Sequence, residues 1–243
     1  SIVGAKGVIA KDNKLTVSVD NILSKINNKT KLVFLANANN PTGTFISKDE
    51  IIRLHKGMPS NVLLVYDAAY SEFIVDPNYI DGSYLVNQYD NVIMLRTFSK
   101  MHGLASLRLG WGYCSNYILN NLMKVRGPFS VNVAAMIAGK VAIEDIDFQK
   151  KSLEHNIKWM DWLEKELKKL GLSYQSSVTN FLLIKFPCEK HKTAENAEIF
   201  LAERGILVRN MSGYNLSSYL RVSLGTEEEN LIFIKELKSF IDN

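Results

Sequence analysis

In Val92-Ile-Met-Leu-Arg-Thr-Phe-Ser-Lys-Met-His-Gly-Leu-Ala-Ser-Leu-Arg108, an apolar run typical of a buried strand ends in two hydroxyl side chains, Thr97 and Ser99. Lys100 follows at once, and Arg108 comes eight residues later. Hydroxyl groups and a guanidinium suit a bound phosphate, and a lysine amine can form a Schiff base with a carbonyl group. A surface lysine after a strand would explain Lys100 alone equally well, so the interpretation depends on the rest of the chain.

The first part of the chain alternates short apolar runs with segments of helical periodicity. Because such alternation favours a mostly parallel sheet with helices on both faces, we predict a large α/β domain over residues 1–146. The capping-box spacing of Ser47-Lys-Asp-Glu50 predicts a helix that begins near Lys48. The predicted buried strands are Lys31–Leu35, Val62–Tyr66, Val92–Leu95 and Leu109–Tyr113, and two further predicted helices cover residues 116–125 and 131–145.

A smaller α+β domain is predicted over residues 147–243. It begins with a long amphipathic helix, Asp147–Leu170, whose apolar stripe repeats at helical spacing and which Gly171 ends. The stripe consists of Leu153, Ile157, Met160, Leu163 and Leu167. The remaining order is strand (Phe181–Phe186), helix (Thr193–Arg204), strand (Ile206–Arg209), strand (Leu220–Leu224) and a final helix after Thr226-Glu-Glu-Glu229.

The composition, with 47% hydrophobic and 22% charged residues, is that of an ordinary globular protein. The formal charge of +4 is spread along the chain, so we expect no nucleic-acid or membrane partner. Cys114 and Cys188 lack metal-type and redox-type spacing, and the histidines lack ligand spacing, so we expect no metal and a cytoplasmic location.

Polar clusters follow three of the predicted strands directly: residues 36–43, Asp67-Ala-Ala-Tyr70, and Thr97 to Lys100. Ligands of open α/β sheets bind at the carboxyl ends of the strands, so these clusters should converge if the strands are neighbours and parallel. Each cluster also has a structural explanation. The segment 40–43 is a good turn sequence, Asp67 could cap a helix, Tyr70 could lie in the core, and Arg108 could be a solvated surface charge.

The order and spacing of these motifs resemble the class I/II aminotransferases, which are pyridoxal-phosphate enzymes of fold type I. The resemblance rests on Asn39-Asn-Pro-Thr-Gly43, Asp67-Ala-Ala-Tyr70, Ser99-Lys100 with Arg108, and Tyr219-Leu-Arg-Val-Ser-Leu-Gly225. Within that group, Thr97–Arg108, Val125-Arg-Gly-Pro-Phe-Ser-Val-Asn132 and Gly205-Ile-Leu-Val-Arg209 are most similar to histidinol-phosphate aminotransferases.

The resemblance implies that pyridoxal 5'-phosphate is the cofactor. Lys100 would form the Schiff base with it and transfer a proton between substrate and cofactor. Asp67 would keep the ring nitrogen protonated, because an adjacent carboxylate favours the cation. Asn40 and Tyr70 would hydrogen-bond the ring hydroxyl. His102 is expected only to pack or hydrogen-bond locally, since lysine already performs the proton transfer.

The resemblance further implies that Thr97, Ser99 and Arg108 hold the cofactor phosphate. Arg221, helped by Arg209, would bind the anionic group of two alternating substrates, histidinol phosphate and glutamate (or 2-oxoglutarate), because a guanidinium can pair with phosphate and carboxylate alike. A strand-end surface arginine remains an alternative for Arg209. The family also implies a homodimer.

The resemblance places this chain after the N-terminal part of the family's fold, so we expect a truncated or split-gene product with an incomplete cofactor site that binds the cofactor weakly. Three functions remain open from the sequence. The first is transamination of histidinol phosphate in histidine biosynthesis, or of an aromatic amino acid. The second is a related decarboxylase or lyase reaction, and the third is a non-catalytic remnant.

Overall fold

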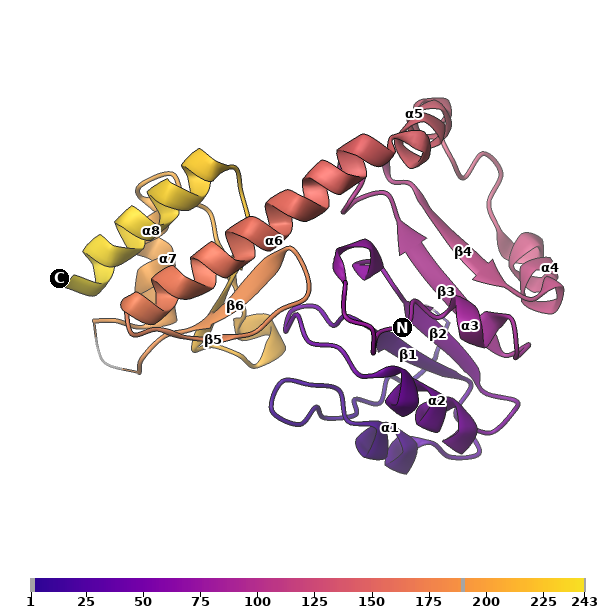
Figure 1. Cartoon of the computed structure of the whole chain (residues 1–243). Coiled ribbons are helices and arrows are strands. Elements are labelled where there is room, and N and C mark those ends of the chain that lie inside the picture. The colour runs from indigo at the N-terminus through magenta and orange to yellow at the C-terminus, as the bar shows by residue number, and fades with distance from the viewer. Residues whose placement is uncertain (1–2, 189–190, 243) are drawn as a thin grey trace. The chain divides into compact units, whose positions relative to one another are not determined.

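The computed structural model describes residues 3–188 and 191–242 of the chain. The chain divides into two compact units (Figure 1). The first comprises residues 1–39 and 45–144, and the second comprises residues 40–44 and 145–243. The short segment 40–44 therefore packs with the second unit although it is flanked on both sides by the first.

A four-stranded sheet of order β1-β2-β3-β4 forms the centre of the first unit. Its strands are β1 (Leu32–Ala36), β2 (Leu63–Asp67), β3 (Val92–Thr97) and β4 (Gly110–Cys114). The pairs β1/β2 and β2/β3 are parallel, while β4 runs antiparallel to β3. The predicted α/β class with a mostly parallel sheet is confirmed.

Helices lie on both faces of this sheet, as the alternation of side chains along the strands shows. Leu64 and Tyr66 of β2 pack in a large core with α1 (Val19–Lys25), α2 (Lys48–Gly57) and α3 (Ser83–Val86). Leu63 and Val65 point the other way and pack with Ile118 of α4 (Asn116–Val125), because successive side chains of a strand alternate between faces. The Ser47 side chain caps α2 by accepting a hydrogen bond from the amide of Glu50, as the capping-box spacing predicted.

Two of the strands predicted to be buried, β1 and β4, lie at the edges of the sheet and are not covered on both faces. In β1, Phe34 is 71% exposed on the face that α4 covers over β2 and β3. Four of the five residues of β4 are exposed as well. The prediction was wrong for β4 and half right for β1, whose Val33 and Leu35 are buried, and the reason is the same. A short apolar run shows that a strand is apolar, and it does not show whether anything covers both of its faces.

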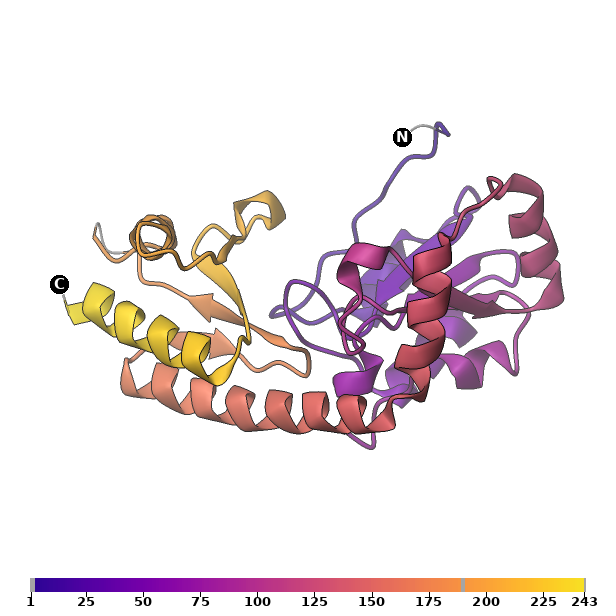
Figure 2. The same ribbon diagram turned by 90° about the horizontal axis from the view of Figure 1, so that it is seen from above.

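The second unit packs α6 (Ile146–Lys169), α7 (Ala194–Ala202) and α8 (Glu227–Asp242) around a four-stranded antiparallel sheet. The sheet order is β5-β6-β8-β7, with β5 at Ser173–Gln175, β6 at Phe181–Lys185, β7 at Arg209–Asn210 and β8 at Tyr219–Ser223. In Figure 2, α8 runs alongside the C-terminal part of α6. This arrangement confirms the smaller α+β domain expected from the sequence.

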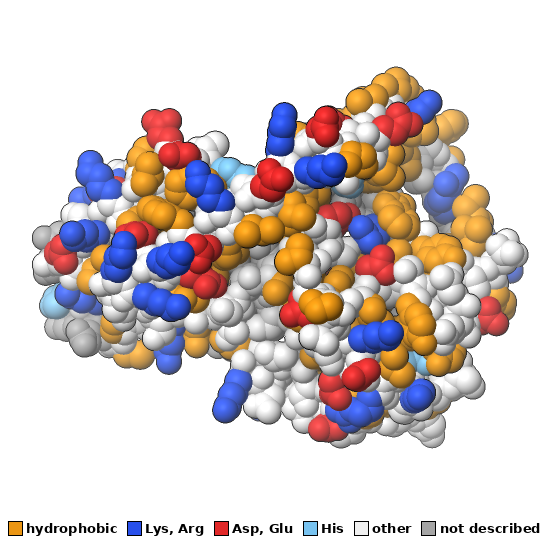
Figure 3. All heavy atoms as spheres, viewed as in Figure 1, with side chains coloured by type: hydrophobic (Ala, Val, Ile, Leu, Met, Phe, Trp, Pro, Cys, Tyr) orange, Lys and Arg blue, Asp and Glu red, His pale blue; other side chains and the backbone are white. Residues whose placement is uncertain are grey.

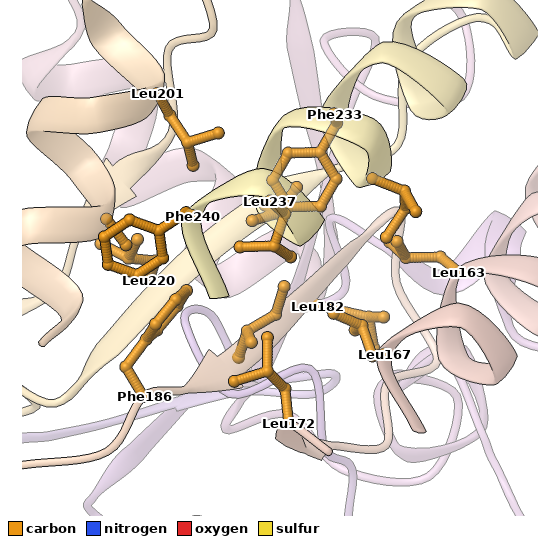
Figure 4. Close-up of a cluster of buried hydrophobic side chains, with 14 of the residues drawn as sticks. Leu163, Leu167, Leu172, Leu182, Phe186, Leu201, Leu220, Phe233, Leu237 and Phe240 are labelled. Carbon is orange, nitrogen blue, oxygen red and sulfur yellow. The ribbon is translucent and has the colours of Figure 1, made fainter. Parts of the chain in front are cut away.

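Apolar side chains from all of these layers form the core of the second unit. Figure 4 shows Leu163 and Leu167 of α6, Leu182 of β6 and Leu237 of α8 converging on one cluster. The predicted stripe of α6 is partly wrong, because Ile157 is half exposed while Asn156 and Trp159 are buried. Asn156 tolerates burial since its amide donates a hydrogen bond to the Thr179 carbonyl (3.1 Å).

Within residues 3–188 and 191–242, no helix has both the length and the apolar character that crossing a lipid bilayer requires. The cytoplasmic location stays a prediction.

Candidate active site

Asp67 and Tyr70 follow the carboxyl end of β2. Asp67 is the last residue of the strand, and its Oδ1 accepts a hydrogen bond from the Ala69 amide at 3.0 Å, which turns the chain immediately after the strand. Tyr70 is buried and precedes a single 3₁₀ turn, η1 (Ser71–Phe73). The strand end therefore presents an exposed carboxylate next to a buried aromatic ring.

The neighbouring strand, β3, ends in Thr97, and a tight turn carries Lys100. The Thr97 hydroxyl accepts a hydrogen bond from the Ser99 amide (3.1 Å), and the Gly103 amide donates to the Lys100 carbonyl (3.0 Å). The Lys100 amine lies 5.2 Å from the centre of the Tyr70 ring. Because β2 and β3 are parallel neighbours, their carboxyl ends meet, and the structure brings together the lysine and tyrosine singled out by the sequence.

Arg108 is a further predicted site residue of the first unit. It follows the 3₁₀ turn η2 (Ala105–Leu107) in the connection from β3 to β4, with a positive φ of 56°, and its side chain donates to the Ala105 carbonyl at 2.6 Å. Hydroxyls (Thr97, Ser99), a guanidinium, an amine and a carboxylate thus lie on the connections after β2 and β3. This donor set fits pyridoxal 5'-phosphate, which needs anion-binding groups for its phosphate, a carboxylate for its protonated ring nitrogen and an amine for its aldehyde.

The other predicted site residues belong to the second unit. Arg221 of β8 donates a hydrogen bond to the Asn40 Oδ1 at 2.6 Å, which ties Asn40 to that unit, and its guanidinium lies 4.8 Å from the centre of the Phe181 ring. Arg209 of β7 is the direct cross-strand partner of Arg221. Two like charges directly opposite each other destabilise a sheet unless an anion neutralises them, so this pair suits a bound carboxylate or phosphate.

Sequence reasoning missed a set of ionic side chains in the first unit. Arg96, near the end of β3, donates to Glu72 Oε1 through Nη2 (2.8 Å) and Nε (3.3 Å) and to Asp81 through Nη1 (3.1 Å). His102 Nε2 lies 4.0 Å from the same Glu72 oxygen. An arginine that interrupts an otherwise apolar strand was the available signal, because a charge there needs a partner.

The model of the family "Aminotransferase class I and II" matches residues 5–237. Histidinol-phosphate aminotransferases of Maricaulis maris and Rhodopseudomonas palustris (strain BisB5) are 47% and 45% identical over 98% of this chain. The match covers 66% and 65% of those proteins, so the chain spans slightly less than two thirds of their length. The structure of histidinol-phosphate aminotransferase from Sinorhizobium meliloti in complex with pyridoxal-5'-phosphate matches with a TM-score of 0.85 and 25% identity, covering 95% of this chain and 63% of that one.

Proposed function

The chain belongs to the class I and II aminotransferase family, and on that premise we propose that it transfers an amino group from histidinol phosphate to 2-oxoglutarate with pyridoxal 5'-phosphate. The proposed substrate follows from the relatives at 44–47% identity, which carry that activity in their names. The observation that carries the proposal is the Lys100 amine over the Tyr70 ring, where the carboxyl ends of two parallel strands meet.

Each residue of the first unit has a distinct task in this proposal. Lys100 supplies the amine that holds the cofactor, and moves a proton to and from the substrate carbon. The cofactor contributes an electron sink, and Asp67 strengthens it by keeping the ring nitrogen protonated. Tyr70 orients the cofactor ring by a hydrogen bond to the ring hydroxyl. Thr97, Ser99 and Arg108 bind the phosphate.

In the second unit, Arg221 with Arg209 binds the anionic group of each substrate in turn. A planar guanidinium can form two parallel hydrogen bonds to either a carboxylate or a phosphate, so one site can serve both substrates. The Asn40 Oδ1 accepts a hydrogen bond from the Arg221 guanidinium, and this bond limits the orientations available to the arginine side chain.

The test is product analysis with the purified chain and an excess of pyridoxal 5'-phosphate. We expect one glutamate to appear for each histidinol phosphate consumed, with 2-oxoglutarate required. Aromatic amino acids as donors test the alternative of an aromatic amino-acid aminotransferase. Release of carbon dioxide tests the alternative of decarboxylase activity. A chain that binds the cofactor and forms no glutamate from any of these donors contradicts the proposal.

We also propose that the chain forms a homodimer through α5 (Val133–Glu144). Val133, Ile137 and Val141 lie one helical turn apart on one face, and each is more than 60% exposed. Hydrophobic side chains gather over α5 in Figure 3. A helix apolar on most sides is normally covered, and a second copy of the chain can cover it.

The oligomeric state tests this proposal. Light scattering is expected to give twice the chain mass of 27.4 kDa for the wild type, and a shift toward the monomer for Ile137→Glu, because a buried charge opposes association. Leu207→Glu is the matched control, since Leu207 is 86% exposed and lies outside α5. A monomeric wild type, or an Ile137→Glu protein that stays dimeric, contradicts the assignment of α5.

A further inference from the structure

Arg96 of β3 contacts several other segments of the first unit. Its guanidinium contacts Glu72 in η1 and Asp81 in the loop before α3, and it lies 5.7 Å from the Trp111 ring in β4. The Arg96 and Glu72 side chains are only 16% and 14% exposed. Most of the ionic contact is therefore removed from water. In such a buried place a guanidinium–carboxylate hydrogen bond is strong and directional.

Glu72 is approached by residues on both sides of Lys100 in the sequence. Arg96 precedes the lysine by four residues, and His102 follows it by two. The His102 side chain is 8% exposed, with Nε2 4.0 Å from Glu72 Oε1 and its ring 4.8 Å from the Phe98 ring. The turn that carries Lys100 thus lies against one carboxylate on both sides, with hydrogen bonds from Arg96 before it and the His102 ring 4.0 Å away after it.

The same carboxylate belongs to the segment that carries the lysine's aromatic neighbour. Glu72 follows Tyr70 by two residues, and the Lys100 amine lies over the Tyr70 ring. These contacts form a closed loop, from Tyr70 along the chain to Glu72, across to Arg96 and His102, and back through Lys100. We propose that Glu72, Arg96 and His102 are positioning residues, which hold the Lys100 amine over the Tyr70 ring.

This inference deepens the proposed function, on which the importance of Lys100 rests. A purely stabilising role fits the contacts poorly, because buried ion pairs often contribute no more stability than apolar side chains of the same size. Among the described residues, Glu72 Oε2 and His102 Nδ1 are buried without a hydrogen-bond partner. Such unsatisfied atoms lower stability. We infer that the arrangement is useful because the planar Arg96 guanidinium fixes the direction of its contact with Glu72.

The test measures Lys100 directly in the cofactor-free protein. Competitive acetylation followed by mass spectrometry reports the reactivity of each lysine amine, and no cofactor or substrate is needed. In Glu72→Gln, which keeps the shape and removes the charge, we expect the half-buried Lys100 amine to become freer and its labelling to rise about threefold or more. The dissociation constant for pyridoxal 5'-phosphate should rise about fivefold or more.

Glu50→Gln is the matched control. Glu50 also accepts two hydrogen bonds from an arginine, Arg53 (2.8 and 2.7 Å), in the same unit, but on an exposed surface of α2. We expect its Lys100 labelling and its cofactor dissociation constant to equal those of the wild type. Arg96→Lys keeps the charge and loses the forked contact, so it should act in the same direction as Glu72→Gln, and it decides the question if Glu72→Gln fails to fold.

The outcomes separate this inference from the proposed function. If Glu72→Gln lowers the unfolding midpoint while Lys100 labelling stays at the wild-type rate, the three residues are structural only and the inference is overturned. If the wild type shows no cofactor binding, the proposed function fails, but the labelling comparison still decides whether Lys100 is positioned by Glu72.

Discussion

The Lys100→Ala protein is expected to lose at least about 10³-fold in kcat for glutamate formation when pyridoxal 5'-phosphate is saturating. Lys100 is the only described lysine whose amine lies over Tyr70, at the strand ends where the proposed cofactor site forms. Without its amine, the substrate carbon loses the group that accepts and returns its proton. The phosphate-binding groups Thr97, Ser99 and Arg108 remain, so non-covalent cofactor binding should persist in weakened form.

Borohydride reduction checks the covalent part of this prediction independently of turnover. The wild-type peptide that contains Lys100 should gain the mass of a reduced cofactor, and the Lys100→Ala protein should gain none. Lys48→Ala is the control, because the Lys48 amine also lies over a tyrosine ring, Tyr84, at 5.1 Å. Labelling at another lysine, or turnover that survives Lys100→Ala, removes Lys100 from the centre of the site.

Local patterns predicted most of the elements because local forces produce them. The helix over residues 116–125 is found at Asn116–Val125, and the capping box at Thr226 is present, with Thr226 and Glu229 exchanging hydrogen bonds at 3.3 and 2.7 Å. Patterns failed where the outcome depends on what covers a surface. The exposure of Phe34 and of β4 is set by neighbours in space, which an apolar run does not specify.

The candidate site could likewise be predicted only in part. Lys100 and Tyr70 could be brought together from the sequence, because strand alternation predicts parallel neighbours and parallel neighbours share a carboxyl edge. The Arg96–Glu72 contact joins residues 24 positions apart through side chains, and no local periodicity encodes it. The packing of residues 40–44 with the second unit was also missed, since a turn sequence predicts a bend and does not predict its partner.

That packing leads to the largest expected effect on stability, at Gly43. Its φ of +74° belongs to the left-handed region, and a Cβ added there would lie 2.2 Å from the Ser177 Oγ and 2.6 Å from its Cβ. The Ser177 hydroxyl cannot simply turn away, because it hydrogen-bonds the Thr179 hydroxyl (2.8 Å) and amide (3.1 Å). We expect Gly43→Ala to lower the free energy of unfolding of the second unit by about 3 kcal/mol, from backbone strain and overpacking together.

Urea unfolding followed by tryptophan fluorescence measures this effect. In a Trp111→Phe background, the remaining two of the three tryptophans, Trp159 and Trp162, lie in α6 and report on the second unit alone. Using one unit's signal matters, since a chain of two units need not unfold in a single transition.

Two companion variants separate the two causes of the loss. Gly205 also has a positive φ (+78°), but nothing lies within 4 Å of an added Cβ, so Gly205→Ala isolates the backbone strain at about 1 kcal/mol. Adding Ser177→Gly to Gly43→Ala removes the overlapping atoms and should recover part of the difference. A Gly43→Ala protein no less stable than Gly205→Ala would mean that residues 40–44 are not held by close packing at Gly43. In that case the Arg221–Asn40 hydrogen bond and the Val178 amide bond to the Gly43 carbonyl (3.0 Å) hold the segment in place.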